Sequence, residues 1–398
     1  MQQKILVINS GSSSVKYQLF DMPDQQVICA GLVERIGMEN ARITHKTAAD
    51  TLEEQGAIAD HEAGLSRMLS MLTDPNTGVL SSTDEVQAVG HRVVHGGSSF
   101  SETTIITEQV KDKIKELYSL APQHNPANYQ GIEVAEKMFP QATQLAVFDT
   151  AFYQSIPQTA YQYAIPTRFL TEHNIRKYGF HGTSHKYVSE KAIEWLGTST
   201  SNIISIHLGN GCSMSAIKDG QCIDTTLGFG PVTGLIMGTR CGDIDHAILV
   251  YLVKHLGYSL EEVNQLLQAE SGMLGLTGYS DLRDIEAAAA EGDKACQLAL
   301  EMSAYRIRQY IGAYTASLNG LDALVFTAGI GENSELIRQL VCRELDCFGI
   351  SLDSEKNRVP AKGIREIQAA ASRVRILVIP TNEELEIARQ SYALIANT

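Results

Sequence analysis

The feature that most constrains this chain is a β-hairpin with a turn of small residues, which occurs twice. The first copy, Lys4–Asp21, is an apolar run, the turn NSGSSS and a second run with strand character. The second copy, Ile203–Lys218, repeats the pattern around a Gly-Asn-Gly turn. Two such hairpins about half a chain length apart predict a duplicated architecture, with a cleft between the halves.

The turn of the first hairpin has the chemistry of a phosphate cradle. Its backbone amides and serine hydroxyls are hydrogen-bond donors, and Lys16 adds a positive charge two residues past Ser14. An ordinary Ser/Gly turn is the alternative for this segment alone. The recurrence of the pattern favours the phosphate interpretation.

Bulk composition narrows the class of protein. A chain of 398 residues suits two domains, and a net charge of −14 argues against general binding to nucleic acid or to an anionic membrane. No apolar run reaches the 18 residues of a membrane span, and the sequence enters a strand without a signal-peptide pattern, so we expect a cytoplasmic protein. The seven scattered cysteines indicate reduced thiols.

An acidic protein that handles phosphate has to concentrate its few arginines. Arg92 lies in the apparently buried strand Val86–Val94, which runs into a Gly-Gly turn, and Arg240 lies in the glycine-rich segment MGTRCGD. For Arg92 a structural ion pair and an anion ligand are both open interpretations.

Three further segments place polar side chains at defined points. Asp149 follows the short strand Leu145–Phe148, where α/β folds position functional groups, although a helix cap is the simpler interpretation. His124 lies between two prolines in a segment expected to be rigid and non-helical. His181 and His185 have the spacing of a metal pair, but we favour a turn in which Ser184 caps the next helix.

The sequence also predicts a second ligand-binding turn. Asp322–Ala328 is a buried strand that ends in GIGENS and opens a helix, a geometry that receives nucleotide phosphate or sugar. It is neither a P-loop nor a dinucleotide fingerprint. A capping box at Thr381–Glu384 starts the last helix; Glu383 is most simply a helix-start acid, with a metal role as the alternative.

The remaining pattern gives the expected elements. We expect further strands at residues 26–36 and 376–379, and helices at 64–72, 107–120, 244–255, 259–268 and 294–318. We expect irregular segments at 38–58 and 272–283, and a surface connection at 353–374.

Nine short blocks together resemble the acetokinase family, the acetate kinases and propionate kinases. In chain order they are NSGSSSVK, HRVVHGG, HNPAN, VFDTAF, GFHGTSH, HLGNG, MGTRCGD, FTAGIGENS and PTNEE. The resemblance runs from residue 4 to about residue 390.

The resemblance implies a fold, a reaction and partners. The fold is the α/β two-domain actin-like ATPase fold shared with sugar kinases, Hsp70 and actin, with duplicated βββαβαβα cores flanking a cleft. The expected domains are 1–149 with 382–398, and a nucleotide-binding domain over 150–381. The implied reaction is ATP + acetate ⇌ ADP + acetyl phosphate by direct in-line transfer, with Mg²⁺ or Mn²⁺, in a homodimer.

The resemblance also assigns residues by position. The catalytic set is Asp149, Arg92, Arg240 and His181. The substrate set is Arg92, Val94, Gln123, His124, Phe180 and Pro231. The nucleotide set is Ser12, Ser14, Lys16, His207, Gly209, Asn210, Gly211, Asp281, Leu282, Arg283, Gly329, Ile330, Gly331 and Asn333. The metal pair is Asn9 and Glu383.

Departures from the family pattern concern the acyl acceptor. Gln123 stands where a leucine is usual, GFGPVTGL replaces a segment close to GFTPLEGL, and His246 replaces a proline. A propionate kinase is therefore the alternative within the family. From other classes, a non-transferring actin- or Hsp70-like ATPase would not need the two arginines with Asp149, and a sugar kinase would need polar sugar ligands.

Overall fold

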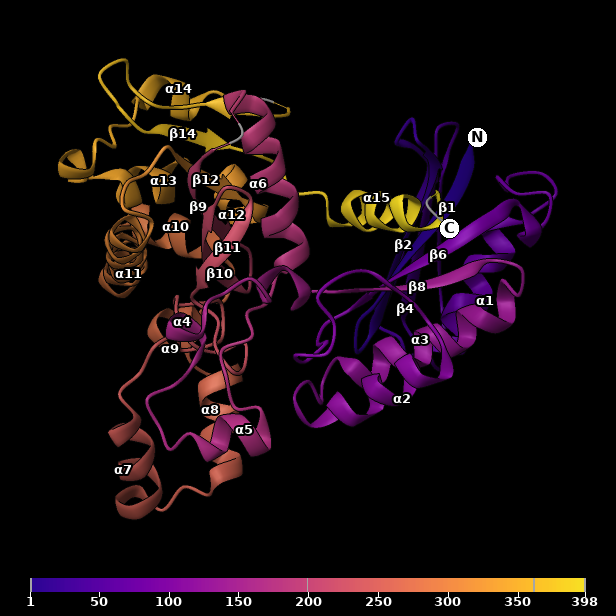
Figure 1. Cartoon of the computed structure of the whole chain (residues 1–398), viewed down its shortest axis with the longest axis horizontal. Helices are drawn as coiled ribbons and strands as arrows, with labels where there is room; N and C mark the ends of the chain where they lie inside the picture. The colour runs from indigo at the N-terminus through magenta and orange to yellow at the C-terminus, as the bar shows by residue number, and fades with distance from the viewer. Residues whose placement is uncertain (1, 199, 361, 397–398) are drawn as a thin grey trace. The chain divides into compact units, whose positions relative to one another are not determined.

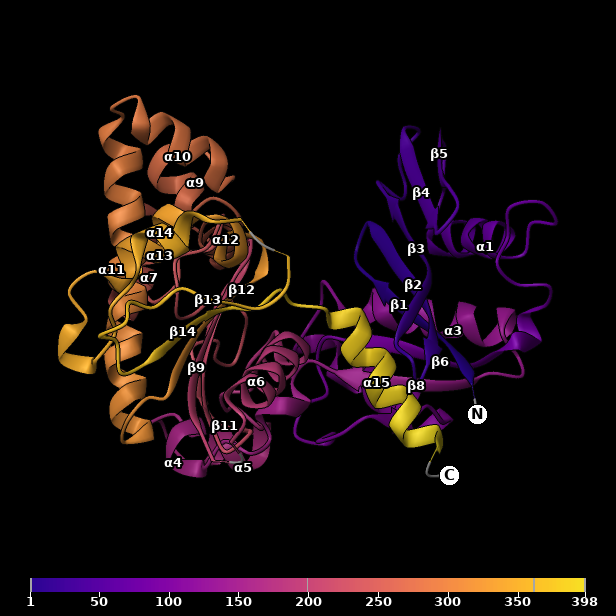
Figure 2. The ribbon, with the colours of Figure 1, turned by 90° about the horizontal axis from the view of Figure 1, so that it is seen from above.

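The structure, a computed structural model, describes residues 2–198, 200–360 and 362–396. It divides into two compact units, Met1–Phe152 with Asn382–Thr398, and Tyr153–Thr381. The first unit continues to Phe152 where we expected a boundary after Asp149. Each unit is built around its own β-sheet (Figures 1 and 2).

The sheet of the first unit has eight strands in the order β5-β4-β3-β2-β1-β6-β8-β7. Strands β1 to β5 pair antiparallel in succession, β6 and β8 run parallel to β1, and β7 pairs antiparallel with β8. The strands are β1 Gln3–Ser10, β2 Ser14–Met22, β3 Gln26–Glu34, β4 Ala41–Thr47, β5 Thr51–Gly56, β6 Val86–Val93, β7 Thr104–Ile105 and β8 Thr143–Phe148.

Helices cover both faces of this sheet, so the middle of its central strand, β1, is apolar. Leu6 and Ile8 of β1 face a core shared with α1 (His61–Leu72) and α3 (Asn125–Met138). Ile5 and Val7 face a second core shared with α15 (Glu383–Ala396). Burial on both faces explains the continuous run ILVI in place of an alternating pattern. Helix α2 (Glu108–Glu116) packs on α3.

The second unit repeats the central part of this topology. Its order is β11-β10-β9-β12-β14-β13, in which β9, β10 and β11 form an antiparallel meander and β12 and β14 run parallel to β9. The core β3-β2-β1-β6-β8 therefore corresponds strand for strand to β11-β10-β9-β12-β14. The strands are β9 Asn202–Leu208, β10 Cys212–Lys218, β11 Gln221–Thr225, β12 Ala323–Thr327, β13 Arg365–Glu366 and β14 Arg375–Val378.

Most helices lie in the second unit. Helix α6 packs on β9 and β12, as α15 packs on β1 and β6 of the first unit, and α11 packs on β9 and β10. The helices are α4 Gln158–Tyr161, α5 Arg168–His173, α6 Gly182–Leu196, α7 His246–Leu256, α8 Leu260–Ala269, α9 Gly272–Thr277, α10 Leu282–Ala290, α11 Lys294–Leu318, α12 Ala328–Asn333, α13 Glu335–Cys342 and α14 Ser354–Arg358.

Three segments differ from the sequence-based expectation. Residues 38–58 contain β4 and β5, because Ala41, Ile43 and His45 alternate into the core although small and polar residues mask that period. Residues 272–283 contain α9 and the start of α10. The segment expected to be non-helical opens α3, since Pro126 falls in the first turn, where its missing N–H costs nothing.

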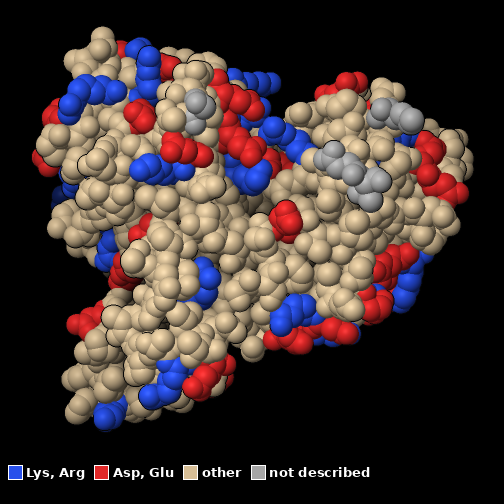
Figure 3. All heavy atoms as spheres, in the orientation of Figure 1, with Lys and Arg blue, Asp and Glu red and all other residues tan. Residues whose placement is uncertain are grey.

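The surface is charged but mixed. On the face shown in Figure 3, acidic and basic side chains are interspersed. Among the described residues, no helix combines the length and the apolar character needed to cross a membrane.

Candidate active site

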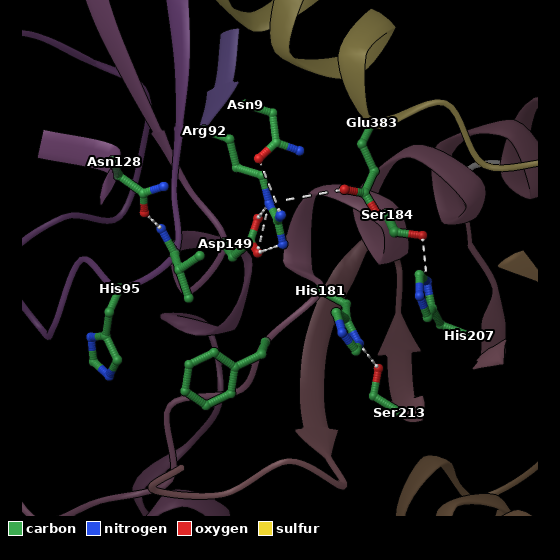
Figure 4. Close-up of polar contacts among 12 residues, drawn as sticks. Asn9, Arg92, His95, Asn128, Asp149, His181, Ser184, His207, Ser213 and Glu383 are labelled. Carbon is green, nitrogen blue, oxygen red and sulfur yellow. Dashed lines mark hydrogen bonds and ion pairs between the residues drawn. The ribbon is translucent and has the colours of Figure 1, made fainter. Parts of the chain in front are cut away.

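Three polar side chains of the first unit meet at the carboxyl ends of adjacent strands. Asn9 lies near the end of β1, Arg92 near the end of β6, and Asp149 directly after β8. Nη2 of Arg92 donates to Oδ2 of Asp149 at 2.6 Å, and Nε lies 3.2 and 3.1 Å from the two carboxylate oxygens. Nη1 donates to Oδ1 of Asn9 at 3.4 Å (Figure 4). The ion-pair alternative for Arg92 is therefore present.

Glu383, the first residue of α15, adds a second carboxylate to this cluster. Its Oε2 lies 3.9 Å from Nε of Arg92. Burial works to lower the pKa of Arg92, but the charges of Asp149 and Glu383 outweigh it and raise that pKa. Burial and the charge of Asp149 raise the pKa of Glu383 despite the neighbouring Arg92. Two carboxylates thus share one guanidinium.

The first hairpin turn lies beside the same helix. Its amide at Gly11 donates to the carbonyl of Ser14 at 2.8 Å, and Ser12 is exposed. Nζ of Lys16 lies 2.7 Å from Oε1 of Glu384, which is almost fully buried. Lys16 is therefore held at the start of α15.

The predicted substrate residues of the first unit lie on two segments. Val94 follows β6, is buried, and donates its amide to Oδ1 of Asn128 at 3.0 Å. His124 is the N-cap residue of α3, and Gln123 is exposed in the turn before it.

In the second unit, a histidine cluster surrounds the start of α6. His181 is the N-cap residue, with a left-handed φ of 61°, and its ring stacks on that of His207 at 4.4 Å between centroids. Its Nδ1 lies 2.9 Å from Oγ of Ser213 (Figure 4). Ser184 does not cap the helix; its hydroxyl is 2.8 Å from both Nδ1 of His207 and Oγ1 of Thr381. Phe180 is buried, and its carbonyl accepts from the hydroxyl of Tyr153.

The contacts of His185 exclude the metal pair with His181, the interpretation that the sequence did not favour. The ring nitrogens of His185 lie 2.9 Å from Oγ of Ser205 and 2.7 Å from Oγ of Ser213, so neither is available to a metal ion.

Arg240 differs from Arg92 in its hydrogen-bond and ion-pair partners. Its Nη1 donates to the carbonyl of Pro231 at 3.0 Å and lies 3.7 Å from Sδ of Met237. Within the described part of the chain, no carboxylate forms an ion pair with it. Burial lowers the pKa of Arg240, only partly offset by Cys212. A half-buried guanidinium without a counter-ion is a site for an anion.

The turn of the second hairpin, Gly209–Gly211, lies against both His181 and Arg240. A Cβ at Gly211 would lie 3.3 Å from Nε2 of His181 and 3.5 Å from Nη1 of Arg240. A side chain at this position would therefore crowd the ring of His181.

The predicted nucleotide residues gather around a cavity of about 640 Å³ in the second unit. Those that line it are Gly209, Asn210, Asp281, Leu282, Arg283, Gly329, Ile330 and Asn333. His207, Gly211 and Gly331 do not appear in its lining. Three residues that were not predicted also line it: Ser280, Glu286 and Ser334. Ser280 and Ser334 directly adjoin predicted residues, whereas Glu286, one turn into α10, gave no signal.

The residues around Arg92 also fit a hard cation. Within residues 2–198, 200–360 and 362–396, no group of three His, Cys, Asp or Glu side chains is arranged to hold a metal ion by itself. However, Asn9 and Glu383 offer oxygen donors, and Asp149, Glu383 and Arg92 leave one negative charge in excess. Magnesium commonly uses one or two carboxylates together with water and substrate phosphates.

The matched strand orders and the two small-residue hairpins define the class: an actin-like ATPase fold built from two related α/β units. The model of the acetokinase family matches residues 4–389, and the chain belongs to that family. It is 62% identical over 394 residues to an acetate kinase of Flavobacterium johnsoniae, covering 99% of this chain and 100% of the relative.

Solved structures of an acetate kinase and a propionate kinase are similar to this chain over nearly its whole length. Porphyromonas gingivalis acetate kinase superposes with a TM-score of 0.93 at 42% identity, covering 99% of this chain and 100% of the other. A propionate kinase from Francisella tularensis gives 0.92 at 41% identity, with coverages of 98% and 99%. The expected fold class and family are thereby confirmed.

Proposed function

We propose that this chain transfers the γ-phosphoryl group of ATP to acetate, reversibly, giving acetyl phosphate and ADP. The observation that carries the proposal is Arg240, a half-buried guanidinium for which the described residues provide no counter-ion, placed against the Gly209–Gly211 turn of a nucleotide-sized cavity. The acetate kinase name of a relative 62% identical over nearly the whole chain supports acetate as the acceptor.

The roles of the charged residues follow from the reaction. A carboxylate attacking a polyphosphate is an encounter of two anions, so positive charge has to balance the equatorial oxygens of the transferring group. We assign that task to Arg92 and Arg240, with His181 as a further hydrogen-bond donor. Asp149 orients Arg92 through its two-point ion pair. No covalent phosphoenzyme is needed for in-line transfer.

Asn9 and Glu383 are the residues that we propose to hold Mg²⁺, or Mn²⁺ in its place. Their oxygen donors and the excess negative charge of the Arg92 cluster support this assignment. The bound ion would supply charge neutralisation at the phosphates.

ATP and ADP would occupy the cavity of the second unit. We propose that Asp281, Leu282, Arg283, Gly329, Ile330 and Asn333 hold the adenosine, and that His207, Asn210 and Gly211 lie along the phosphates. Ser12, Ser14 and Lys16 would serve the phosphates from the first hairpin. ATP is a cytoplasmic metabolite, which supports a cytoplasmic location.

The acyl group would be held by Val94, Phe180 and Pro231, with His124 and Gln123 nearby. Val94 and Phe180 are buried apolar side chains, which suits a methyl group. A propionate kinase activity is the second candidate, supported by the propionate kinase structure at 41% identity.

We propose a homodimer that uses α7. The helix HAILVYLVKHL is apolar on nearly all sides, yet no residue of it is buried; Tyr251 and Leu256 are 55% and 56% exposed. Such a helix is normally covered. Tyr251→Glu should give monomers in sedimentation velocity, whereas Leu298→Glu, at an exposed leucine of α11, should not. A dimeric Tyr251→Glu variant would move the interface elsewhere.

A hydroxylamine trap tests the proposed reaction. Enzyme, ATP, Mg²⁺ and acetate should yield acetohydroxamate in proportion to ADP. ADP without hydroxamate would instead indicate a non-transferring ATPase.

A further inference from the structure

Three buried side chains of the second unit form a continuous hydrogen-bonded series that ends at His181. Oγ of Ser205 on β9 lies 2.9 Å from Nδ1 of His185, whose Nε2 lies 2.7 Å from Oγ of Ser213 on β10. Oγ of Ser213 lies 2.9 Å from Nδ1 of His181. Ser205, His185 and Ser213 are all fully buried.

The protons of this series can be counted. Burial, and then the charge of His207, lower the pKa of His185 well below its ordinary value, so its ring is neutral and carries one N–H. Each serine hydroxyl also carries one proton. Because Ser213 lies between two imidazole nitrogens, it donates to one and accepts from the other.

Two directions are then possible. In the first, Ser205 donates to His185, His185 donates through Nε2 to Ser213, and Ser213 donates to Nδ1 of His181. In the second, every bond reverses, and the proton of Ser205 points away from His185.

Ser205 distinguishes the two directions. Throughout the described residues, His185 is the only hydrogen-bond partner of the Ser205 hydroxyl. The second direction would therefore leave a fully buried donor without an acceptor, whereas the first gives an acceptor to the protons of Ser205, His185 and Ser213. A stranded buried donor is costly enough to favour the first direction by roughly five-fold or more.

We propose that Ser205, His185 and Ser213 are positioning residues that keep the proton of neutral His181 on Nε2. The tautomer of a histidine is set by the bond that its other nitrogen makes, and here that bond is donated by Ser213. The Nε2 edge is the one that lies against the Gly211 turn.

This inference deepens the proposed function and rests on it for its catalytic meaning. With the proton on Nε2, His181 presents a hydrogen-bond donor toward the turn assigned to the phosphates. With the proton on Nδ1, it would present a lone pair to anionic oxygens, which repels them. The series therefore makes a neutral histidine a dependable donor in the transition state.

The test is ¹⁵N NMR of the histidine-labelled full-length protein, in which ring-nitrogen shifts separate the two tautomers. The His181 signals are assigned with His181→Gln. We expect the Nε2–H tautomer in the wild type. Ser213→Ala, which removes the hydroxyl that donates to Nδ1 of His181, should give a mixture of the two tautomers. Ser215→Ala is the matched control, because Ser215 is a buried serine on β10 whose hydroxyl bonds to Thr225 instead.

Activity provides a second readout. Ser213→Ala should lower kcat by about ten-fold or more while the KM values for ATP and acetate stay within about two-fold, and Ser215→Ala should change neither. An Nδ1–H tautomer in the wild type, or a Ser213→Ala spectrum identical to that of the wild type, would overturn the inference. Acyl phosphate formation by the same protein would leave the proposed function intact. Conversely, an Nε2–H tautomer in a protein that forms no acyl phosphate would support the inferred direction of the hydrogen bonds and reject the proposed function.

Discussion

Arg92 and Asp149 form a two-point ion pair at the carboxyl ends of neighbouring parallel strands, with Nη2 and Oδ2 2.6 Å apart. The side chain of Asp149 is 1% exposed and that of Arg92 is 21% exposed. The guanidinium of Arg240, by contrast, donates to a carbonyl and a thioether and forms no ion pair within the described residues. Arg92 is therefore expected to support the stability of the fold as well as the proposed reaction, whereas Arg240 is expected to serve the reaction alone.

The alanine variants should separate these two contributions. Arg92→Ala and Arg240→Ala should each lower kcat on the order of 10³-fold, as expected for arginines that stabilise a transferring phosphoryl group. Only Arg92→Ala should also destabilise the fold, by about 3 kcal/mol, because it breaks a pair with a buried carboxylate. Steady-state kinetics and urea unfolding measure the two effects.

Lysine substitutions are the matched controls. Arg92→Lys should recover part of the free energy of unfolding but little of kcat, because lysine lacks the planar fork that engages two oxygens. An Arg240→Ala variant within a few-fold of the wild-type kcat would remove Arg240 from the reaction.

Where local pattern and packing agree, the sequence predicted the fold well. The two hairpins, the long helix Lys294–Leu318 and the strand before GIGENS are confirmed because each has an unbroken apolar period or a strong turn. β4 was missed because its inward residues include His45, a polar side chain that is buried through its bond to Tyr17. That partner lies on another strand and leaves no local signal.

In the candidate site, too, local motifs were informative and contacts between distant segments were not predicted. Asn210, Asp281 and Gly329, which the motifs predicted to bind nucleotide, line the cavity of the second unit, and their role stays a prediction. The motifs gave no account of what holds the motif residues in place. The bonds from Ser205 to His185 and from Lys16 to Glu384 join segments far apart in sequence, so only the folded chain reveals them.

Gly238 is predicted to be essential for nucleotide binding although it does not line the cavity. A Cβ there would lie 2.0 Å from Oδ1 of Asn210 and 3.2 Å from the carbonyl of Ser280. Gly238→Ala should displace Asn210 and raise the KM for ATP by about ten-fold, with a smaller effect on the KM for acetate.

Gly312→Ala is the control for a glycine substitution in the same unit. Its Cβ would lie 3.5 Å from the ring of Phe348, an ordinary contact, so the KM for ATP should not change. Equal KM values in Gly238→Ala and wild type would show that Asn210 does not bind the nucleotide.

His91 should make the protein sensitive to acid. Burial lowers its pKa to about 4, partly offset by the bond between Nε2 and Gln144, from 6.5 in the unfolded chain. Between these values the unfolded state binds more protons, so the free energy of unfolding falls as the pH falls from 6.5 to 4. The loss from this one group amounts to about 3 kcal/mol.

Urea unfolding from pH 7 to pH 4 measures this loss. A His91→Gln variant has no proton to bind there, so its stability should fall less steeply than that of the wild type across this window. Parallel curves for the two proteins would show that His91 is already protonated in the fold, or that it stays neutral in both states.

The last prediction concerns which acid is the acceptor. Gln123, the most prominent departure from the family pattern, is exposed in the turn before α3, so its amide is solvated and does not line an apolar wall. Gln123→Leu should therefore change the ratio of kcat/KM for propionate over acetate by less than about three-fold.

Val94, in contrast, is buried, and Val94→Ala would make room for one more methylene, which is worth about 0.8 kcal/mol or about four-fold. We expect Val94→Ala to raise the ratio by at least that factor. A large change with Gln123→Leu together with no change in Val94→Ala would assign the acyl pocket to the turn before α3 and remove Val94 from it.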